Sequence, residues 1–244
     1  MRVGIIADIH SNAIALQSAL ERLVDVDEIW CLGDIVGYGP DPAECVDLIK
    51  ARSHRCIAGN HDLCVLQEIN ASDFNPDALK ACLWNRDHLD AEHLGYLQNL
   101  PLILEPVPGI TLAHGSPRDG IWEYILSSWQ ADEVLSKSSS SLIFVGHTHI
   151  PLVFKKMPGM PVETIALIEG EMLRLDRGEA RYLINPGSIG QPRDGDSRAS
   201  FMIFNIDDYL LEYHRIEYPI KTTQEEMERS GLPTALADRL AYGL

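Results

Sequence analysis

The chain has 244 residues, of which 45% are hydrophobic and 23% charged, a composition typical of a globular protein with one large domain or two small ones. Its formal net charge of −16 argues against binding to long nucleic acids or anionic membranes, because both require a basic surface. The same charge would repel a phosphate substrate unless a local feature reverses its sign.

The first sixty residues predict alternating strands and helices. The run RVGIIAD is short and continuously apolar, which is typical of a strand buried on both faces, and its early Asp8 does not fit a secretory signal peptide. The expected strands are residues 2–8, 27–34 and 55–60, and the expected helices are 13–23 and 41–51. Asp41 and Pro42 suit the cap and first turn of the second helix. This order predicts parallel strands joined by right-handed crossovers.

The rest of the chain predicts a helical segment, a β-rich region and a helical tail. Residues from 62 to about 100 are polar with helical spacing, broken at Asn75-Pro76 and Leu100-Pro101. One helix is expected at 127–137, and further strands at 102–106, 110–115, 142–145, 151–156, 171–175, 180–187, 200–206 and 210–216. Thr223 and Glu226 fit a capping box at the start of the tail.

The sequence has no linker-like segment and no internal repeat, so we expect a single domain over residues 1–244. It would carry a helical insertion at about 62–100 and a helical tail at about 222–244. No apolar stretch approaches the length of a membrane span. The five cysteines form no CxxC pair and lie largely in apolar segments, which indicates reduced, packed thiols in a cytoplasmic protein without membrane contact.

Polar side chains follow several predicted strands at the point where each strand ends. They are Asp8, His10, Asp34, Asn60, His61, His114, His147 and His149. His147 and His149 stand at i and i+2, so in extended backbone both would point to the same side. The carboxyl ends of parallel strands line one crevice in open α/β sheets, so we expect these side chains to converge. Taken singly, such residues are also common as turn residues, caps or hydrogen-bonded core histidines.

The motifs ADIH, GD, GNHD, AHG and GHTH, in this order, resemble those of the calcineurin-like metallophosphoesterases. This resemblance covers residues 1 to about 150. The later NPGSIGQPRDGDSRAS resembles the C-terminal motif of the small bacterial phosphodiesterase branch, which is often labelled diadenosine-tetraphosphatase-like. The resemblance implies an α/β fold in which two mixed β-sheets pack face to face as a sandwich flanked by helices.

The resemblance also implies a two-metal site. One metal would be held by Asp8, His10 and His149. The other would be held by Asn60, His114 and His147. Asp34 would bridge both, and His61 would stay off the metals and face the substrate. Nitrogen and oxygen ligands without thiolate suit Mn²⁺, Fe or Zn²⁺, with Mn²⁺ favoured.

Such a site implies a reaction. Two divalent metals can share a water, lower its pKa towards neutrality and seat a phosphate in spite of the acidic chain. A metal-bridging hydroxide would then attack phosphorus in line. His61 would either protonate the leaving oxygen or hydrogen-bond the phosphate, and the alternative is a turn histidine beside Asn60.

The sequence departs from the GD-x-VDRG stretch of the serine/threonine phosphatases in this superfamily. It reads GDIVGYG, so Gly37 stands in place of the aspartate that would orient the acid histidine, and Tyr38 in place of a phosphate-binding arginine. This departure argues against phosphoprotein phosphatase activity. Asp62 could compensate by orienting His61, or it could cap a helix.

Phosphate contacts could instead come from Arg193 or Arg118, since the guanidinium fork suits phosphoryl oxygens, although a surface ion pair is the alternative for each. Asn12 could touch the substrate, but it also suits the N-cap of the following helix. Aromatic residues that could stack a nucleobase, line the cleft or simply pack are Tyr38, Trp122 and Tyr124.

We therefore expect a dinuclear metal-dependent phosphoesterase that acts on phosphodiesters, phosphomonoesters or dinucleoside polyphosphates. The partner would be a small phosphate ester or nucleotide, without long nucleic acid or membrane. The alternatives are a non-catalytic metal-binding scaffold, a protein phosphatase and a nuclease. The full ligand set with His61 argues against a scaffold, and the acidic charge argues against a nuclease. The sequence leaves open the natural substrate, the native metals and the oligomeric state.

Overall fold

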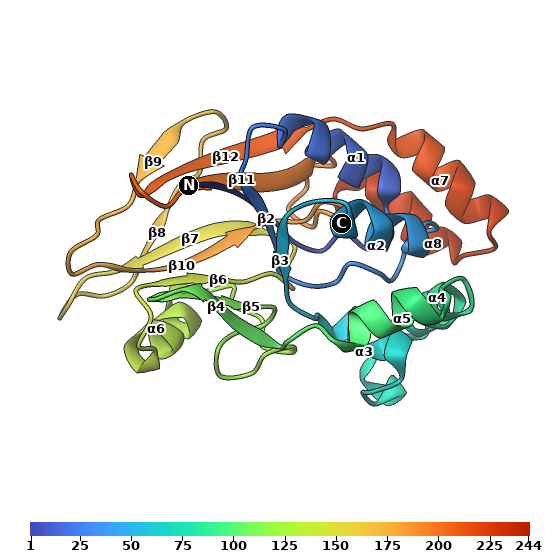
Figure 1. Ribbon diagram of the computed structural model, residues 1–244, viewed down its shortest axis with the longest axis horizontal. Helices are drawn as coiled ribbons and strands as arrows, with labels where there is room; N and C mark the ends of the chain where they lie inside the picture. Colours follow the sequence, from blue (N-terminus) through green and yellow to red (C-terminus); the bar gives the residue numbers. More distant parts are fainter.

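The computed structural model describes the backbone of residues 1–244 and the surroundings of every side chain except that of Ala71. In the described chain, two mixed β-sheets of six strands each form the centre of the molecule (Figure 1). The first sheet runs β3 (His54–Cys56), β2 (Glu28–Cys31), β1 (Arg2–Ile6), β11 (Ala199–Asn205), β12 (Leu210–Ile216) and β9 (Met172–Arg174). The second runs β4 (Ile103–Val107), β5 (Ile110–Ala113), β6 (Leu142–Phe144), β10 (Arg181–Pro186), β7 (Pro151–Lys156) and β8 (Glu163–Ile165).

The strand pairings explain why both sheets are mixed. β1 pairs in parallel with β2, and β2 with β3, as the alternation of strands and helices predicts. The other neighbour of β1 is β11, which returns antiparallel from the far end of the sequence. In the second sheet β5, β6 and β10 are parallel, and β7 is antiparallel to β10. The expected fold of two mixed sheets is confirmed.

The two sheets share one apolar core. Ile5, Trp30 and Phe204 of the first sheet belong to the same buried cluster as Leu112 and Phe144 of the second. Burying one large apolar side chain contributes about 1.5–3 kcal/mol, so a layer of such residues holds the sheets face to face. This core fixes where the strands end, and therefore where the following loops lie.

Helices cover the outer faces of the sandwich (Figure 1). α1 (Ala13–Arg22) and α2 (Pro42–Lys50) bury Leu16 and Val46 in the cluster that lies outside the first sheet. α6 (Ser128–Lys137) buries Val134 against Phe154 of the second sheet. The five cysteines are free and buried, and no helix among the described residues is long and apolar enough to cross a membrane.

The segment expected to be helical between the third strand and Leu100 contains four short helices. They are α3 (Asn60–Leu66), the 3₁₀ turn η1 (Ala71–Asp73), α4 (Pro76–Asp87) and α5 (Ala91–Gln98). α4 begins after Asn75, whose side-chain oxygen accepts a hydrogen bond from the Ala78 amide at 2.9 Å. The Asn75-Pro76 break in the sequence is therefore the start of a helix.

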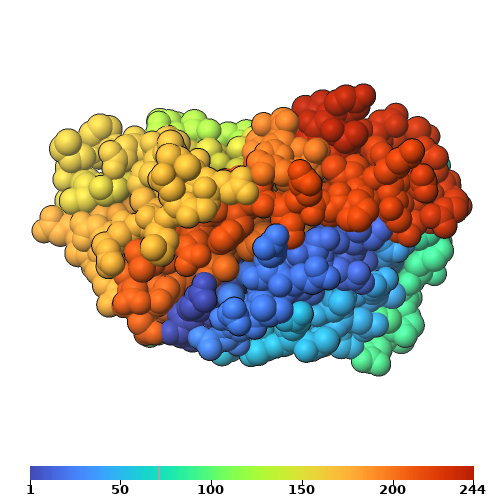
Figure 2. Space-filling model, turned by 90° about the horizontal axis from the view of Figure 1, so that it is seen from above, coloured from blue at the N-terminus to red at the C-terminus, as the bar shows by residue number. Residues whose placement is uncertain are grey.

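The C-terminal segment forms α7 (Ile220–Arg229), α8 (Thr234–Asp238) and the 3₁₀ turn η2 (Arg239–Tyr242). Figure 2 shows this segment in red, alongside the N-terminal part of the chain in blue. Met227 and Leu240 pack in one cluster with Ala81 of α4 and Tyr38. The tail therefore lies against the same loops that carry the polar motifs.

One expectation about the later elements is wrong, and one strand was not predicted. The capping box at Thr223 does not form, because α7 already begins at Ile220 after Pro219, whose carbonyl accepts from the Thr222 amide at 2.9 Å. Thr223 lies inside the helix, and its hydroxyl donates to the side-chain oxygen of Asn12 at 3.2 Å. The short edge strand β8 was not expected, because its three residues Glu163–Ile165 carry no apolar alternation long enough to detect.

Candidate metal centre and phosphate pocket

The loops that follow β1 and β2 are bonded directly to each other. The Asp8 amide donates to the Gly33 carbonyl at 3.1 Å, and the His10 amide donates to the Asp34 carbonyl at 3.0 Å. Gly59 has to be a glycine here, because a Cβ at this position would lie 2.1 Å from the Oδ1 atom of Asp34. Parallel pairing thus brings three separate strand ends to one edge of the sheet.

Candidate ligand atoms gather in two groups that share one carboxylate. The atoms of each group lie within 4.8 Å of one another. The first group is Asp8, His10, Asp34 and His149, and the second is Asp34, His114 and His147. The side-chain oxygen of Asn60 lies 3.1 Å from Nε2 of His114, beside the second group. All seven side chains are buried.

Several of these residues have a backbone conformation that non-glycine residues rarely adopt. The positive φ angles are 52° at Asp8, 50° at His10, 54° at Asp34, 66° at His147 and 59° at His149. Each such residue costs about 1–3 kcal/mol, and the conformation persists only where the surrounding structure imposes it. Residues of this kind cluster at functional sites, so their concentration in the two groups marks the candidate centre independently of the motifs.

Three of the imidazoles are held through Nδ1. Nδ1 lies 2.8 Å from the Leu32 carbonyl in His114, 2.5 Å from the Gln191 carbonyl in His149 and 3.3 Å from the Val36 carbonyl in His10. A carbonyl oxygen only accepts, so Nδ1 carries the hydrogen and the ring turns Nε2 into the site. Nε2 of His10 and of His149 are 3.1 Å apart.

The protonation of these rings suits metal binding. Burial lowers the pKa of His10 and His149 well below the usual histidine value and that of His147 to about 3, so these rings are neutral at pH 7. His114 differs, because the Asp34 carboxylate overcomes the effect of burial and raises its pKa to about 9. A cation that binds Asp34 and His114 therefore has to displace a proton.

Asp34 lies between the two groups. Its Oδ1 accepts a hydrogen bond from the His61 amide at 2.8 Å. Its Oδ2 lies 3.5 Å from Nε2 of His10 and 3.3 Å from Nε2 of His114. Although burial opposes ionisation, the neighbouring imidazoles of His114 and His61 hold the pKa of Asp34 below its usual range. Asp34 is therefore a buried carboxylate that faces both groups.

Two buried polar atoms at this point form no hydrogen bond of normal geometry in the part of the chain that the structure describes, although one of them has the imidazole contacts just given. They are Oδ2 of Asp34 and Nε2 of His147. His114 is the one candidate ligand ring with a second hydrogen to donate, so the carboxylates and the neutral rings of His10, His147 and His149 bring together more buried acceptors than there are hydrogens to satisfy them, which is costly. Cations between the groups would satisfy these acceptors, so the residues present fit a site for divalent metals.

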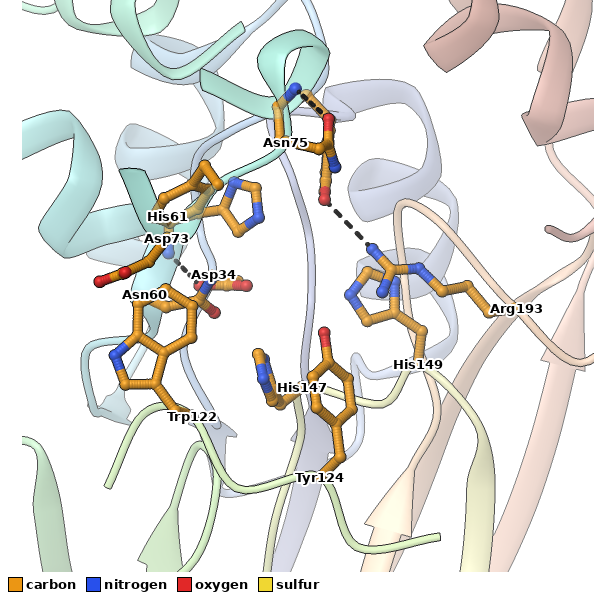
Figure 3. A pocket seen from close by; sticks show the side chains of 13 residues that line it. Asp34, Asn60, His61, Asp73, Asn75, Trp122, Tyr124, His147, His149 and Arg193 are labelled. Carbon is orange, nitrogen blue, oxygen red and sulfur yellow. Dashed lines mark hydrogen bonds between the residues drawn. The ribbon is translucent and has the colours of Figure 1, made fainter. Parts of the chain in front are cut away.

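A pocket opens beside the two groups (Figure 3). It is lined by His61, Arg193, Tyr38, Trp122 and Tyr124 together with Asp34, Asn60, Asp73, Phe74, Asn75, Ala78, His147 and His149. Trp122 and Arg193 flank the pocket from opposite sides (Figure 3). The Arg193 guanidinium donates to the Tyr38 hydroxyl at 3.3 Å and to the Gln191 side chain at 2.9 Å. It forms no ion pair within the described residues and can face an anion.

Asn12 and Arg118 do not line this pocket. Asn12 caps α1 by accepting from the Ala15 amide at 3.1 Å, and its amide group donates to the Gly190 carbonyl at 3.0 Å. Arg118 forms ion pairs with Glu123 and Glu133 outside the pocket. The structure thus brings together the predicted residues His61, Tyr38 and Arg193, and leaves Asn12 and Arg118 in the cap and ion-pair arrangements that were their alternatives.

Asp62 does not orient His61. Its carboxylate accepts from the amides of Asp34 at 2.8 Å, Gly59 at 2.9 Å and Val36 at 3.1 Å, so it ties the loop after β2 to the start of α3. The helix-capping alternative describes it correctly. Sequence reasoning missed Phe74 and Asn75, which line the pocket from the segment before α4, because nothing in that segment marks it as close to the motifs.

Comparison with known proteins identifies the family. The sequence model of the calcineurin-like phosphoesterase superfamily domain matches residues 1–209. The crystal structure of a metallophosphoesterase from Sphaerobacter thermophilus is 43% identical and superposes with a TM-score of 0.88, covering 100% of this chain and 99% of that one. An uncharacterised protein of Methanocaldococcus jannaschii is 40% identical over 99% of this chain and 98% of its own length.

A more distant relative carries a named activity. A symmetrical bis(5'-nucleosyl)-tetraphosphatase of Actinobacillus pleuropneumoniae is 30% identical over 145 residues, which are 55% of this chain and 53% of that protein. The chain therefore matches about half the length of this relative. A putative diadenosine tetraphosphatase of known structure, 16% identical with a TM-score of 0.54, shares the fold.

Proposed function

The chain belongs to the calcineurin-like phosphoesterase superfamily, and we propose that it is a dinuclear metal-dependent phosphoesterase that hydrolyses small phosphate esters. The observation that carries this proposal is the convergence of two groups of buried acceptors on Oδ2 of Asp34, beside a pocket that holds an arginine and a histidine. A pair of cations would also explain how an acidic chain binds an anionic substrate.

We assign the ligands as two sets that share one carboxylate. Asp8, His10 and His149 would hold one metal, and Asn60, His114 and His147 the other, with Asp34 in contact with both. When bound, two divalent ions supply Lewis acidity to the phosphate and lower the pKa of a shared water. The donor set suits Mn²⁺, Fe or Zn²⁺, and we favour Mn²⁺.

The side chains of the pocket would bind and orient the substrate. The Arg193 guanidinium would hold a phosphoryl oxygen, since its own partners, the Tyr38 hydroxyl and the Gln191 side chain, are uncharged. His61 lines the same pocket, off both ligand groups, and would donate a hydrogen bond to the phosphate or a proton to the leaving oxygen. The buried carboxylates Asp8 and Asp34 would offset part of the charge of the metals and leave the centre positive towards a phosphate.

The pocket suits a small ester with an aromatic or heterocyclic group. Trp122 and Tyr124 line it, Trp122 lies opposite Arg193, and the ring centroids of Phe74 and Trp122 are 5.5 Å apart. Such rings can stack on a nucleobase while the arginine holds the phosphate. Phosphodiesters, phosphomonoesters and dinucleoside polyphosphates all remain within the proposed substrate class.

A turnover assay with matched variants tests this proposal. We expect hydrolysis of bis-p-nitrophenyl phosphate by the purified protein with Mn²⁺, loss of turnover after chelation, and recovery when Mn²⁺ is added back. His61→Ala should lower kcat by about 10²–10⁴-fold while the metal content stays that of the native protein. Absence of turnover on diester, monoester and nucleotide substrates with Mn²⁺, Fe²⁺ and Zn²⁺ would instead favour the scaffold.

A further inference from the structure

Among the described residues, one side chain lies within hydrogen-bond distance of Nδ1 of His61. The Cys82 sulfur lies 3.2 Å from this nitrogen. Aromatic groups pack on the ring, with the centroid of the imidazole 4.3 Å from that of Tyr38 and 5.0 Å from that of Phe74, and His61 also lines the pocket. Cys82 is fully buried, so water does not compete for this contact.

The position that the family resemblance assigns to an orienting aspartate has no room for a side chain. Gly37 adopts a φ of 101°, and a Cβ at this residue would lie 2.6 Å from Nδ1 of His61. Any side chain at position 37 would collide with the imidazole that it is supposed to orient. The partner of His61 therefore comes from another element, which is α4.

α4 is fixed to the loops of the candidate centre one turn after Cys82. The Asn85 side-chain oxygen accepts from the Gly37 amide at 2.8 Å and from the Ser11 hydroxyl at 2.5 Å. The Asn85 amide group donates to the Gly39 carbonyl at 3.0 Å. Residues three apart on a helix share a face, so the anchor at Asn85 also fixes where the Cys82 thiol points.

We propose that Cys82 is a positioning residue, an inference that rests on the proposed role of His61. The Cys82 thiol would hold the imidazole so that the ring presents Nε2–H to the phosphate in the pocket. A thiol can donate weakly to an imidazole nitrogen. With Nδ1 accepting this bond, the neutral ring carries its proton on Nε2. His61 then acts as an oriented hydrogen-bond donor.

Kinetics on three cysteine variants test this assignment. Cys82→Ala should lower kcat for bis-p-nitrophenyl phosphate about tenfold with little change in KM, the scale on which loss of an orienting hydrogen bond acts. Cys82→Ser should retain kcat to within about threefold, because its hydroxyl can make the same bond. Cys45→Ala is the control, since Cys45 is equally buried, whereas the contact with Nδ1 of His61 is made by Cys82. Equal losses in the alanine and serine variants, or no loss in either, would overturn the assignment.

The tautomer of His61 provides a second readout that does not depend on turnover. Long-range ¹H–¹⁵N correlation, with His61→Gln to identify the signals, should find the Nε2–H tautomer in the native protein and in Cys82→Ser. Cys82→Ala should change it to a mixture. An Nδ1–H tautomer in the native protein, or an unchanged spectrum in Cys82→Ala, would contradict the positioning role. An inactive native protein would refute the proposed function, and the spectra would still decide the role of Cys82.

Discussion

Asp34 is the residue on which both groups of candidate ligands meet. Asp34→Asn keeps the shape of the side chain but removes its charge, so we expect the protein to lose metal and kcat to fall at least about a hundredfold. Elemental analysis and turnover on the same samples measure both effects. Asp119→Asn is the control, because Asp119 lies at a turn outside the pocket lining. Native metal content and turnover in Asp34→Asn would contradict the shared role.

Arg193 and Arg118 are a matched pair, since both were predicted from the sequence but only Arg193 lines the pocket. Arg193→Ala should raise KM about tenfold, because a hydrogen bond between charged groups contributes about 1.5–3 kcal/mol. Arg118→Ala should leave KM near its native value, since Arg118 is paired with Glu123. Steady-state kinetics on one phosphodiester measures both, and equal effects of the two substitutions would show that Arg193 does not bind phosphate.

At the scale of residues, the sequence could identify side chains that follow buried strands, but not their partners. His147 and His149 stand out because two imidazoles follow an apolar run. The Leu32 and Gln191 carbonyls, which orient His114 and His149, are backbone groups that no residue type announces. The sequence indicated only that Cys82 is a packed thiol. Its contact with His61 depends on the packing of α4 against α3.

At the scale of elements, α1 depends on Asn12 for more than its cap. The Asn12 side chain also contacts Gly190 and Thr223, and so joins the helix to the β10–β11 loop and to α7. Asn12→Ala should therefore cost more than the usual ~1 kcal/mol of an N-cap, about 2 kcal/mol or more. Ser127→Ala, at the exposed N-cap of α6, should cost only the cap. Urea unfolding of both variants tests this difference, and equal losses would contradict it.

The elements that could be predicted are those with strong local patterns. β1, α1, β2 and α2 follow from continuous apolar runs and helical spacing, and the structure has them in that order. The predicted start of α7 was wrong because a Thr-x-x-Glu pattern at Thr223 matched a capping box, whereas the N-cap is Pro219, four residues earlier. The docking of α7 and α8 against Tyr38 and α4 could not be predicted, since it joins segments more than 130 residues apart.

At the scale of the whole molecule, a net charge of −16 surrounds a centre with two buried carboxylates, so cation binding should stabilise the fold. A ligand present at a hundred times its Kd adds about 2.7 kcal/mol to the free energy of unfolding. We expect Mn²⁺ to raise the Tm of chelator-treated protein by several degrees. Calorimetry with and without Mn²⁺ measures this shift, and an equal shift in Asp34→Asn would mean that Mn²⁺ binds elsewhere.

The central claim is that one carboxylate is shared by two cations at the meeting point of distant loops. Anomalous diffraction from crystals grown with Mn²⁺ tests it most directly. We predict two peaks about 3.5–4 Å apart, both within bonding distance of the Asp34 carboxylate. One peak should contact His10 and His149, and the other His114 and His147. A single peak, or peaks that do not touch Asp34, would contradict the account.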